Sequence, residues 1–155
     1  MKNYLDDLQV LKSAEQLADL IWEEIIKWEP FEKETIGKQL TRSADSIGAN
    51  IAKAYGRFHF GEKKQFLYYA RGSLYETKFW LNRLSKRDLL NQKTVTQFLN
   101  LSIQIPKELN SFIAYIKKLQ KESKLSLKEP DPIYQSTHPK NQYHLFPPED
   151  KDSNL

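Results

Sequence analysis

Hydrophobic residues recur at intervals of three and four positions in four successive stretches of the chain, as they do on one face of an α-helix. The first stripe consists of Ala14, Leu17, Ala18, Ile21, Ile25 and Trp28. Ser13 and Gln16 have the spacing of a capping box, and Pro30 cannot continue a helix that precedes it. The sequence therefore predicts a first helix that begins near Ser13 and ends before Pro30.

The second stripe is about five helical turns long. It consists of Ile36, Leu40, Ala44, Ile47, Ile51 and Ala54. Gly56 and Gly61 follow it, and glycine is common where helices end. We expect a helix over residues 33–55.

Two further stripes complete the pattern, and no segment shows the strict alternation of a strand. The third consists of Phe66, Ala70, Leu74, Thr77, Leu81 and Leu84. The fourth consists of Val95, Phe98, Ile105, Leu109, Phe112, Ile116 and Leu119. Pro106 lies inside the fourth stripe, lacks an N–H group and crowds the preceding turn. We therefore expect a kink or a local break over residues 102–106.

Four amphipathic helices with short connections predict an all-α fold, an antiparallel up-and-down four-helix bundle, because each stripe is buried only against the others. The bundle is expected over residues 1–120. Residues 121–155 contain five of the seven prolines and form an expected extended, largely irregular C-terminal tail. Two interpretations remain open for its aromatic residues, which are Tyr134, Tyr143 and Phe146. The tail docks on a neighbouring subunit or a partner, or it is a simple extended terminus.

The amino-acid composition restricts the possible functions of the chain more than its length of 155 residues does. The chain has no cysteine, five glycines and three histidines, which excludes disulfides and thiolate chemistry and disfavours a phosphate-binding enzyme. No stretch approaches the length of a membrane span, and the charged start lacks the apolar segment of a secretory signal. We expect a cytoplasmic protein that is not an enzyme, has no cofactor and has no membrane partner.

Charge is divided unevenly along the chain. Residues 1–34 have a net charge of −5, whereas residues 35–93 have a net charge of +8. Such asymmetry is typical of a surface that binds a polyanion, and it also steers acidic and basic surfaces of protomers towards each other.

A two-part motif lies in the second and third predicted helices. It reads SIGANIAKAYGR at residues 46–57 and FLYYARGSLYE at residues 66–76. This motif resembles the signature of the bacterial four-helix bundle family of large-subunit ribosomal RNA intervening-sequence proteins. A similar bundle occurs as the accessory variability protein of diversity-generating retroelements. The chain departs from the usual pattern at Gly48 for Pro, Lys53 for Glu and Ala54 for Gly.

The resemblance covers about residues 5–120 and implies a homo-oligomer, specifically a homopentamer of bundles. For the retroelement branch it also implies binding to RNA and to a reverse transcriptase. The Lys53 departure adds positive charge within the motif itself.

Basic residues form two rows on the predicted helices. Lys38, Arg42, Lys53 and Arg57 share a sector opposite the apolar stripe of the second helix. On the third helix, a single stripe contains Lys64, Tyr68, Arg71, Tyr75 and Lys78. Lysine and arginine can neutralise phosphates, and tyrosine rings can stack on the bases of single-stranded RNA.

An alternative reading of the third helix is a subunit interface. Tyr68, Tyr75, Phe79 and Trp80 cannot all face one core, so some of them are expected between subunits. Arg71 would then pair with acidic residues of the first helix in a neighbour. The tyrosines favour the interface reading, whereas the lysines and arginines favour nucleic acid.

Other polar residues do not assemble into catalytic or metal sites in the sequence. Ser46, Asn50, Ser73 and Glu76 lie in the motif and are expected to be structural. The acidic residues lack the Glu-x-x-His pattern of di-metal bundles, and His59 is expected in a loop, as a polar residue or an RNA contact.

These observations together predict an oligomeric RNA-binding accessory protein that assists a reverse transcriptase or another ribonucleoprotein. The alternative is an interaction scaffold whose basic band and tail dock an acidic partner protein.

Overall fold

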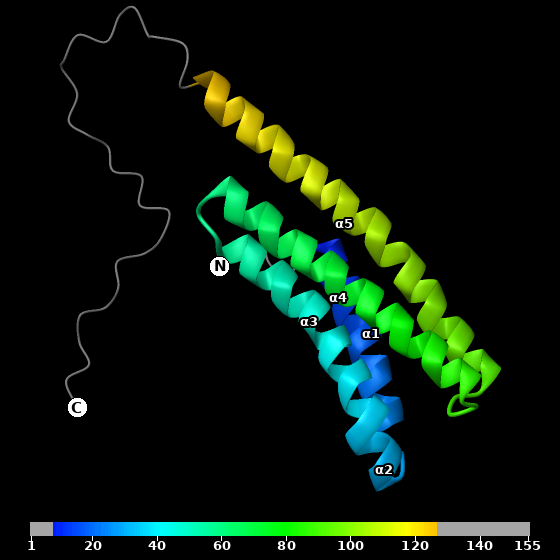
Figure 1. Ribbon diagram of the computed structural model, residues 1–155. Helices are drawn as coiled ribbons and strands as arrows, with labels where there is room; N and C mark the ends of the chain where they lie inside the picture. The colour runs from blue at the N-terminus through cyan, green and yellow to red at the C-terminus, as the bar shows by residue number, and fades with distance from the viewer. Residues whose placement is uncertain (1–7, 127–155) are drawn as a thin grey trace, which may run out of the picture.

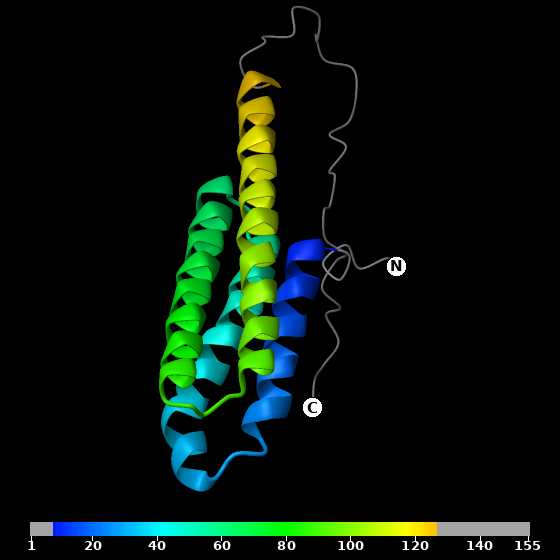
Figure 2. The same ribbon diagram turned by 90° about the vertical axis from the view of Figure 1, so that its right-hand side faces the viewer.

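The computed structural model describes residues 8–126, and they form an all-α, antiparallel four-helix bundle (Figures 1 and 2). Its elements are α1 (Gln9–Ile25), α2 (Pro30–Glu32), η1 (Lys33–Gly37), α3 (Lys38–Gly56), α4 (Phe60–Lys86) and α5 (Gln92–Ser126). Short connections at residues 26–29, 57–59 and 87–91 reverse the chain between the long helices. The fold predicted from the four stripes is confirmed.

The four long helices form a cycle in which α1 packs on α3 and α5, and α4 packs on the same two helices. α1 and α4 therefore lie diagonally across the bundle. The predicted stripes form the core, with Leu17, Ile47, Leu74 and Leu109 all without solvent exposure. Phe66 and Phe112 are only partly buried, and their neighbours Leu67 and Ile113 take the core positions.

The start of the second long helix differs from its prediction. Pro30 is the first residue of α2, where its missing N–H and fixed φ favour a helix start, and α2, η1 and α3 run on without a break. η1 is a π-helical turn that ends at Gly37. A Cβ at Gly37 would lie 2.9 Å from Ile25 Cγ2, so only glycine allows this turn to approach α1 so closely.

The predicted capping box at Ser13 is wrong. α1 begins at Gln9, so Ser13 lies one turn inside the helix, where it is buried and accepts a 3.4 Å hydrogen bond from Gln9 Nε2. Gly61 likewise lies in the first turn of α4 and ends no helix.

The predicted break at Pro106 is also wrong. α5 is helical from Gln92 to Ser126, and Figure 2 shows it as one rod without a sharp bend. Packing of Ile105 and Leu109 into the core holds the helix together across the missing hydrogen bond. α5 also continues six residues beyond the expected bundle boundary at residue 120. The rest of the expected tail, residues 127–155, lies outside the described residues.

Buried hydroxyl groups in the core have partners. Thr77 Oγ1 donates to Ser43 Oγ at 3.1 Å, and it also lies 2.8 Å from the Ser73 carbonyl oxygen. Ser43 Oγ in turn donates to the Leu40 carbonyl at 2.9 Å. This chain of hydrogen bonds joins α3 to α4 and lets polar groups enter the apolar core without an unpaired donor.

Candidate nucleic-acid interface

The α3–α4 connection and the C-terminal part of α5 lie together at one end of the bundle, the upper end in Figures 1 and 2. Lys63 Nζ, in the first turn of α4, donates to the Tyr55 carbonyl of α3 at 3.0 Å. Lys64 Nζ donates to Gln120 Oε1 of α5 at 2.9 Å. These two lysines thus tie the start of α4 to the ends of both neighbouring helices.

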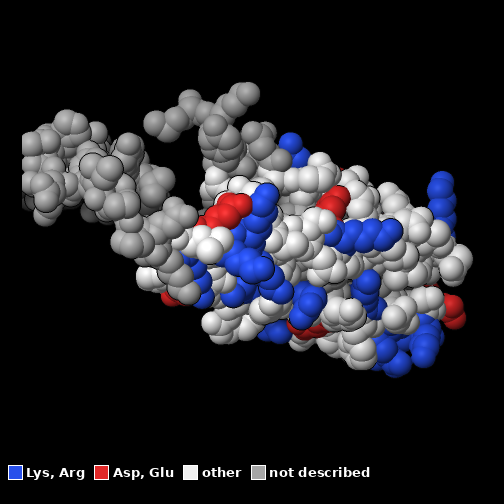
Figure 3. All heavy atoms as spheres, turned by 90° about the horizontal axis from the view of Figure 1, so that it is seen from above, with Lys and Arg blue, Asp and Glu red and all other residues white. Residues whose placement is uncertain are grey.

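Eight basic residues gather at this end of the bundle, which we call the basic end. They are Lys53, Arg57, Lys63, Lys64, Lys117, Lys118, Lys121 and Lys124. In Figure 3 a dense group of Lys and Arg covers the half of the molecule that carries the end of α5, with less red than blue. Glu62 and Glu122 are the carboxylates in the same turns.

Most of the Lys and Arg residues in the part of the chain that the structure describes have no ion pair with a carboxylate of that part. Residues 8–126 hold 20 Lys and Arg against 13 Asp and Glu. Within residues 8–126, ion pairs closer than 4.0 Å are limited to Lys27–Glu24, Arg42–Glu76 and Lys118–Glu122. The basic end therefore presents a net positive surface to solvent.

Aromatic rings lie among these cations. Arg57 Cζ lies 4.7 Å from the centroid of the Phe66 ring, and Lys53 Nζ lies 6.0 Å from the same centroid. Phe58 is 73% exposed in the α3–α4 connection, and its ring meets His59 edge to face at 5.3 Å. An exposed ring flanked by Arg57 can stack on an unpaired base while the cation reaches its phosphate.

Burial shifts the pKa of one lysine in the cluster. Partial burial lowers the pKa of Lys63, whose ammonium donates to backbone carbonyls at the end of α3. A cation at a helix C-terminus is favourable because the last carbonyls carry partial negative charge. Lys63 thus has a structural role in addition to its charge.

The predicted basic row on α3 divides into two parts. Lys53 and Arg57 belong to the basic end, whereas Lys38 lies 15 residues earlier in the helix, about 22 Å away along its axis. Arg42 also lies near the start of α3 and pairs with Glu76 of α4 at 3.9 Å.

The predicted stripe on α4 is present, but it extends beyond the basic end. Lys64 lies in the basic end, while Arg71 and Lys78 lie two and four turns further along the helix. Tyr68, Tyr75 and Phe79 are exposed, as expected for residues that one core cannot accommodate. Trp80 instead packs partly against the core and points its Nε1 towards Glu76 Oε1 at 3.5 Å.

The motif polar residues make local contacts, as expected for structural roles. Ser46 Oγ donates to the Arg42 carbonyl at 2.7 Å, and Asn50 Nδ2 donates to the Ser46 carbonyl at 2.9 Å. Ser73 Oγ donates to the Tyr69 carbonyl at 3.1 Å.

Sequence reasoning missed the four lysines near the end of α5 and also missed Lys63. Periodicity within one helix does not reveal which ends of different helices meet, and α5 was expected to break and to end early. The available signal was the density of lysine over residues 117–124.

The part of the chain that the structure describes contains neither a candidate metal site nor a candidate membrane-spanning helix. Residues 8–126 contain no group of three or more His, Asp or Glu residues placed to hold a metal ion. Over the same residues, none of the helices combines the length and apolar character needed to cross a membrane.

A solved structure is similar to this chain over most of its bundle. It is a protein of unknown function from the S23 ribosomal protein family of Bacteroides thetaiotaomicron. The two share 26% sequence identity with a TM-score of 0.61, and the match covers 67% of this chain and 97% of the other. Among curated proteins, none matches this sequence.

Residues 6–111 match the family described as 23S rRNA-intervening sequence protein. This range includes all of α1 to α4, both halves of the motif and the first part of α5. The chain therefore belongs to the 23S rRNA-intervening sequence protein family.

Proposed function

We propose that this protein is a non-enzymatic RNA-binding protein of the cytoplasm, which works as a homo-oligomer and as an accessory factor of a larger ribonucleoprotein. The observation that carries the proposal is the basic end, where α3, α4, α5 and the α3–α4 connection together supply eight cations and two carboxylates. A surface of this kind binds phosphates through displacement of their counterions.

The arrangement favours RNA with unpaired bases over a smooth duplex. Phe58 stands exposed beside Arg57 at the tip of the bundle, so one base can stack on the ring while neighbouring phosphates meet the cations. Loops, bulges and strand ends are the RNA features that fit this geometry.

The oligomer, the pentameric ring and a role beside a reverse transcriptase belong to the same proposal and rest on the family resemblance. The exposed aromatic residues of α4 support the oligomer, because a monomer gains nothing from leaving Tyr75 and Phe79 in water.

Purification under two conditions tests the proposal. Protein purified at low salt should carry RNA, seen as excess absorbance at 260 nm, and ribonuclease or high salt should remove it. If the preparation instead carries an acidic protein that resists nuclease, the interaction scaffold is the correct function. Protein that carries no nucleic acid, and binds no single-stranded RNA at low salt, would contradict the proposal.

A further inference from the structure

The outward side of α4 is an aromatic face that no other element of residues 8–126 covers. Tyr68, Tyr75 and Phe79 are 41%, 65% and 54% exposed. Gly72 lies among them in the helix interior, and a Cβ built there meets no atom within 4 Å. Glycine in a helix interior is less stable than alanine, and no packing within residues 8–126 requires it here.

Two cations lie on the same face. Arg71 Cζ lies 5.1 Å from the centroid of the Tyr68 ring, and Lys78 Nζ lies 5.7 Å from that of Tyr75. Neither cation has a carboxylate of residues 8–126 within 4.0 Å. We call this surface the aromatic face. It combines three apolar rings with two positive charges and consists of Tyr68, Arg71, Tyr75, Lys78 and Phe79.

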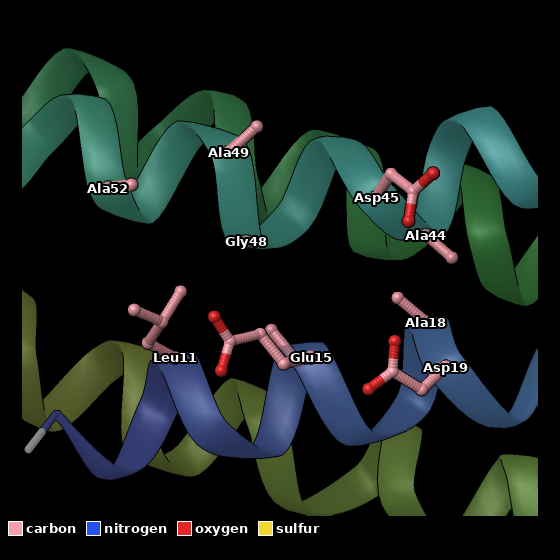
Figure 4. Close-up of a pocket in the computed structure, with 10 residues that line it drawn as sticks. Leu11, Glu15, Ala18, Asp19, Ala44, Asp45, Gly48, Ala49 and Ala52 are labelled. Atoms are coloured by element: carbon pink, nitrogen blue, oxygen red, sulfur yellow. The ribbon is translucent and has the colours of Figure 1, made fainter. Parts of the chain in front are cut away.

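A groove of opposite character runs between α1 and α3 (Figure 4). It encloses about 320 Å³. Its lining is made of small and aliphatic residues with three carboxylates: Leu11, Ala14, Glu15, Ala18, Asp19, Ala44, Asp45, Gly48, Ala49 and Ala52. Figure 4 shows Glu15 and Asp19 on α1 and Asp45 on α3, at the space between the two helices. We call this feature the acidic groove.

The carboxylates of the acidic groove lack cationic partners among the described residues. No Lys or Arg of residues 8–126 lies within 4.0 Å of Glu15, Asp19 or Asp45. Partial burial, and then the charge of Asp19, raises the pKa of Asp45, so the charged form of this carboxylate is disfavoured in the folded chain.

One chain cannot bring these two surfaces together. The acidic groove lies between α1 and α3, whereas α4 lies diagonally opposite α1 in the cycle of helices. The aromatic face and the acidic groove therefore belong to different sides of the bundle, and residues 8–126 of one chain leave both uncovered.

We propose that the aromatic face of one copy docks into the acidic groove of the next copy, head to tail. Tyr68 and Tyr75 would cover the floor of alanines and glycine, while Arg71 and Lys78 would meet Asp19 and Asp45. The charge division of the chain supports this pairing, because residues 1–34 carry −5 and residues 35–93 carry +8. A head-to-tail contact uses two different surfaces, so copies add in one direction until a ring closes.

The inference rests on the oligomer of the proposed function and is independent of RNA. It assigns Arg71 and Lys78 to the contact between copies and leaves Lys53, Arg57 and Lys64 at the basic end for RNA. Both surfaces can then act in the same assembly.

Charge reversal on each surface tests the pairing. The face variant Arg71→Glu/Lys78→Glu and the groove variant Asp19→Lys/Asp45→Lys should each raise the dissociation constant of the oligomer by roughly 30-fold or more. Light scattering at micromolar concentration should then find a mass near 18.3 kDa for each. A chain that carries all four substitutions should assemble again, because the charges are exchanged across the contact.

A control variant, Lys93→Glu/Lys107→Glu, makes the same change in net charge at two exposed positions of α5 and should leave the mass unchanged. Circular dichroism checks that each variant is folded. If the groove variant does not fold, Asp19→Asn/Asp45→Asn replaces it and should weaken assembly without reversing charge.

Three outcomes would overturn the pairing. The first is that either folded variant keeps the mass of the wild-type oligomer. The second is that the fourfold variant stays dissociated. The third is that the face variant loses RNA affinity while its mass is unchanged. A wild-type protein that is monomeric at tens of micromolar would overturn the proposed oligomer as well. Loss of RNA binding in an assembly that passes the exchange test would overturn only the RNA proposal.

Discussion

Phe58 is the residue whose environment most strongly favours nucleic-acid binding. It is 73% exposed in a three-residue connection, so neither the core nor a neighbouring helix accounts for an aromatic ring there. Arg57 precedes it and is itself stacked on Phe66. A ring in this position offers a flat surface to a base beside a positively charged group.

Replacing Phe58 with alanine should weaken binding to single-stranded RNA by about 1–3 kcal/mol with little change in salt dependence, because stacking involves no counterion release. Fluorescence anisotropy at several salt concentrations measures both quantities. Phe31→Ala is the matched control, since Phe31 is 75% exposed near the opposite end of the bundle. Equal losses for the two variants would show that Phe58 has no specific role.

The charged side chain of Asp45 is unfavourable for the folded state of a single chain. Because burial and Asp19 raise its folded pKa above the ordinary 3.8, its charged form destabilises the native state above the folded pKa. This destabilisation fades as the pH falls from the folded pKa towards 3.8, and below 3.8 Asp45 is protonated in both the folded and the unfolded state.

Asp45→Asn should therefore raise the melting temperature of the monomer at neutral pH, and the gain should shrink as the pH is lowered towards 4. Thermal melts are recorded at a concentration where light scattering finds monomer. Glu23→Gln, at an exposed position of α1, should have little effect. A lower melting temperature for Asp45→Asn at neutral pH would contradict the proposed destabilisation.

At the scale of elements, the four hydrophobic stripes were sufficient to predict the four long helices and their antiparallel packing. The ends of the helices were harder to predict from sequence, because local signals compete with packing. Ser13 has the right residue type for a cap, yet the apolar pattern continues upstream through Val10 and Leu11, and burial of both residues extends the helix. Pro106 has the strongest breaking signal in the chain, but core contacts on either side outweigh one lost hydrogen bond.

The π-helical turn η1 could not be predicted, since it depends on contact between two elements. Gly37→Ala should destabilise the fold by about 1–3 kcal/mol, because the added Cβ would lie 2.9 Å from Ile25 Cγ2 and 3.1 Å from the Glu32 carbonyl oxygen. Chemical denaturation measures the change.

Gly61→Ala provides the control, because nothing lies within 4 Å of its added Cβ. Alanine is the better helix former, so this change should be neutral or stabilising by up to about 1 kcal/mol. Destabilisation of equal size at both positions would show that close packing at Gly37 is not the cause.

At the scale of the whole molecule, function is expected to reside in surfaces that several helices build together. The basic end combines α3, α4 and α5, and its members are spread over residues 53–124. The sequence identified Lys53, Arg57 and Lys64, which lie in periodic rows. It also placed Lys38, Arg42, Arg71 and Lys78 in the same interface, and the structure separates these four from the basic end.

The different roles that we propose for the basic end and for the surfaces between copies follow from their charge. α1 carries four carboxylates and one lysine, whereas most of the cations without an ion pair in residues 8–126 lie on α3, α4 and α5. Phosphate binding at the basic end is the central claim, because the proposed RNA-binding function depends on it.

The salt dependence of RNA affinity tests this claim most directly. For Lys53→Gln/Arg57→Gln/Lys64→Gln, the slope of log affinity against log salt should become shallower by about 0.7 for each lost phosphate contact. The control Lys86→Gln/Arg87→Gln/Lys93→Gln removes the same charge at exposed positions of the opposite end and should keep the wild-type slope. Equal slopes for the wild type and both variants would contradict phosphate binding at the basic end.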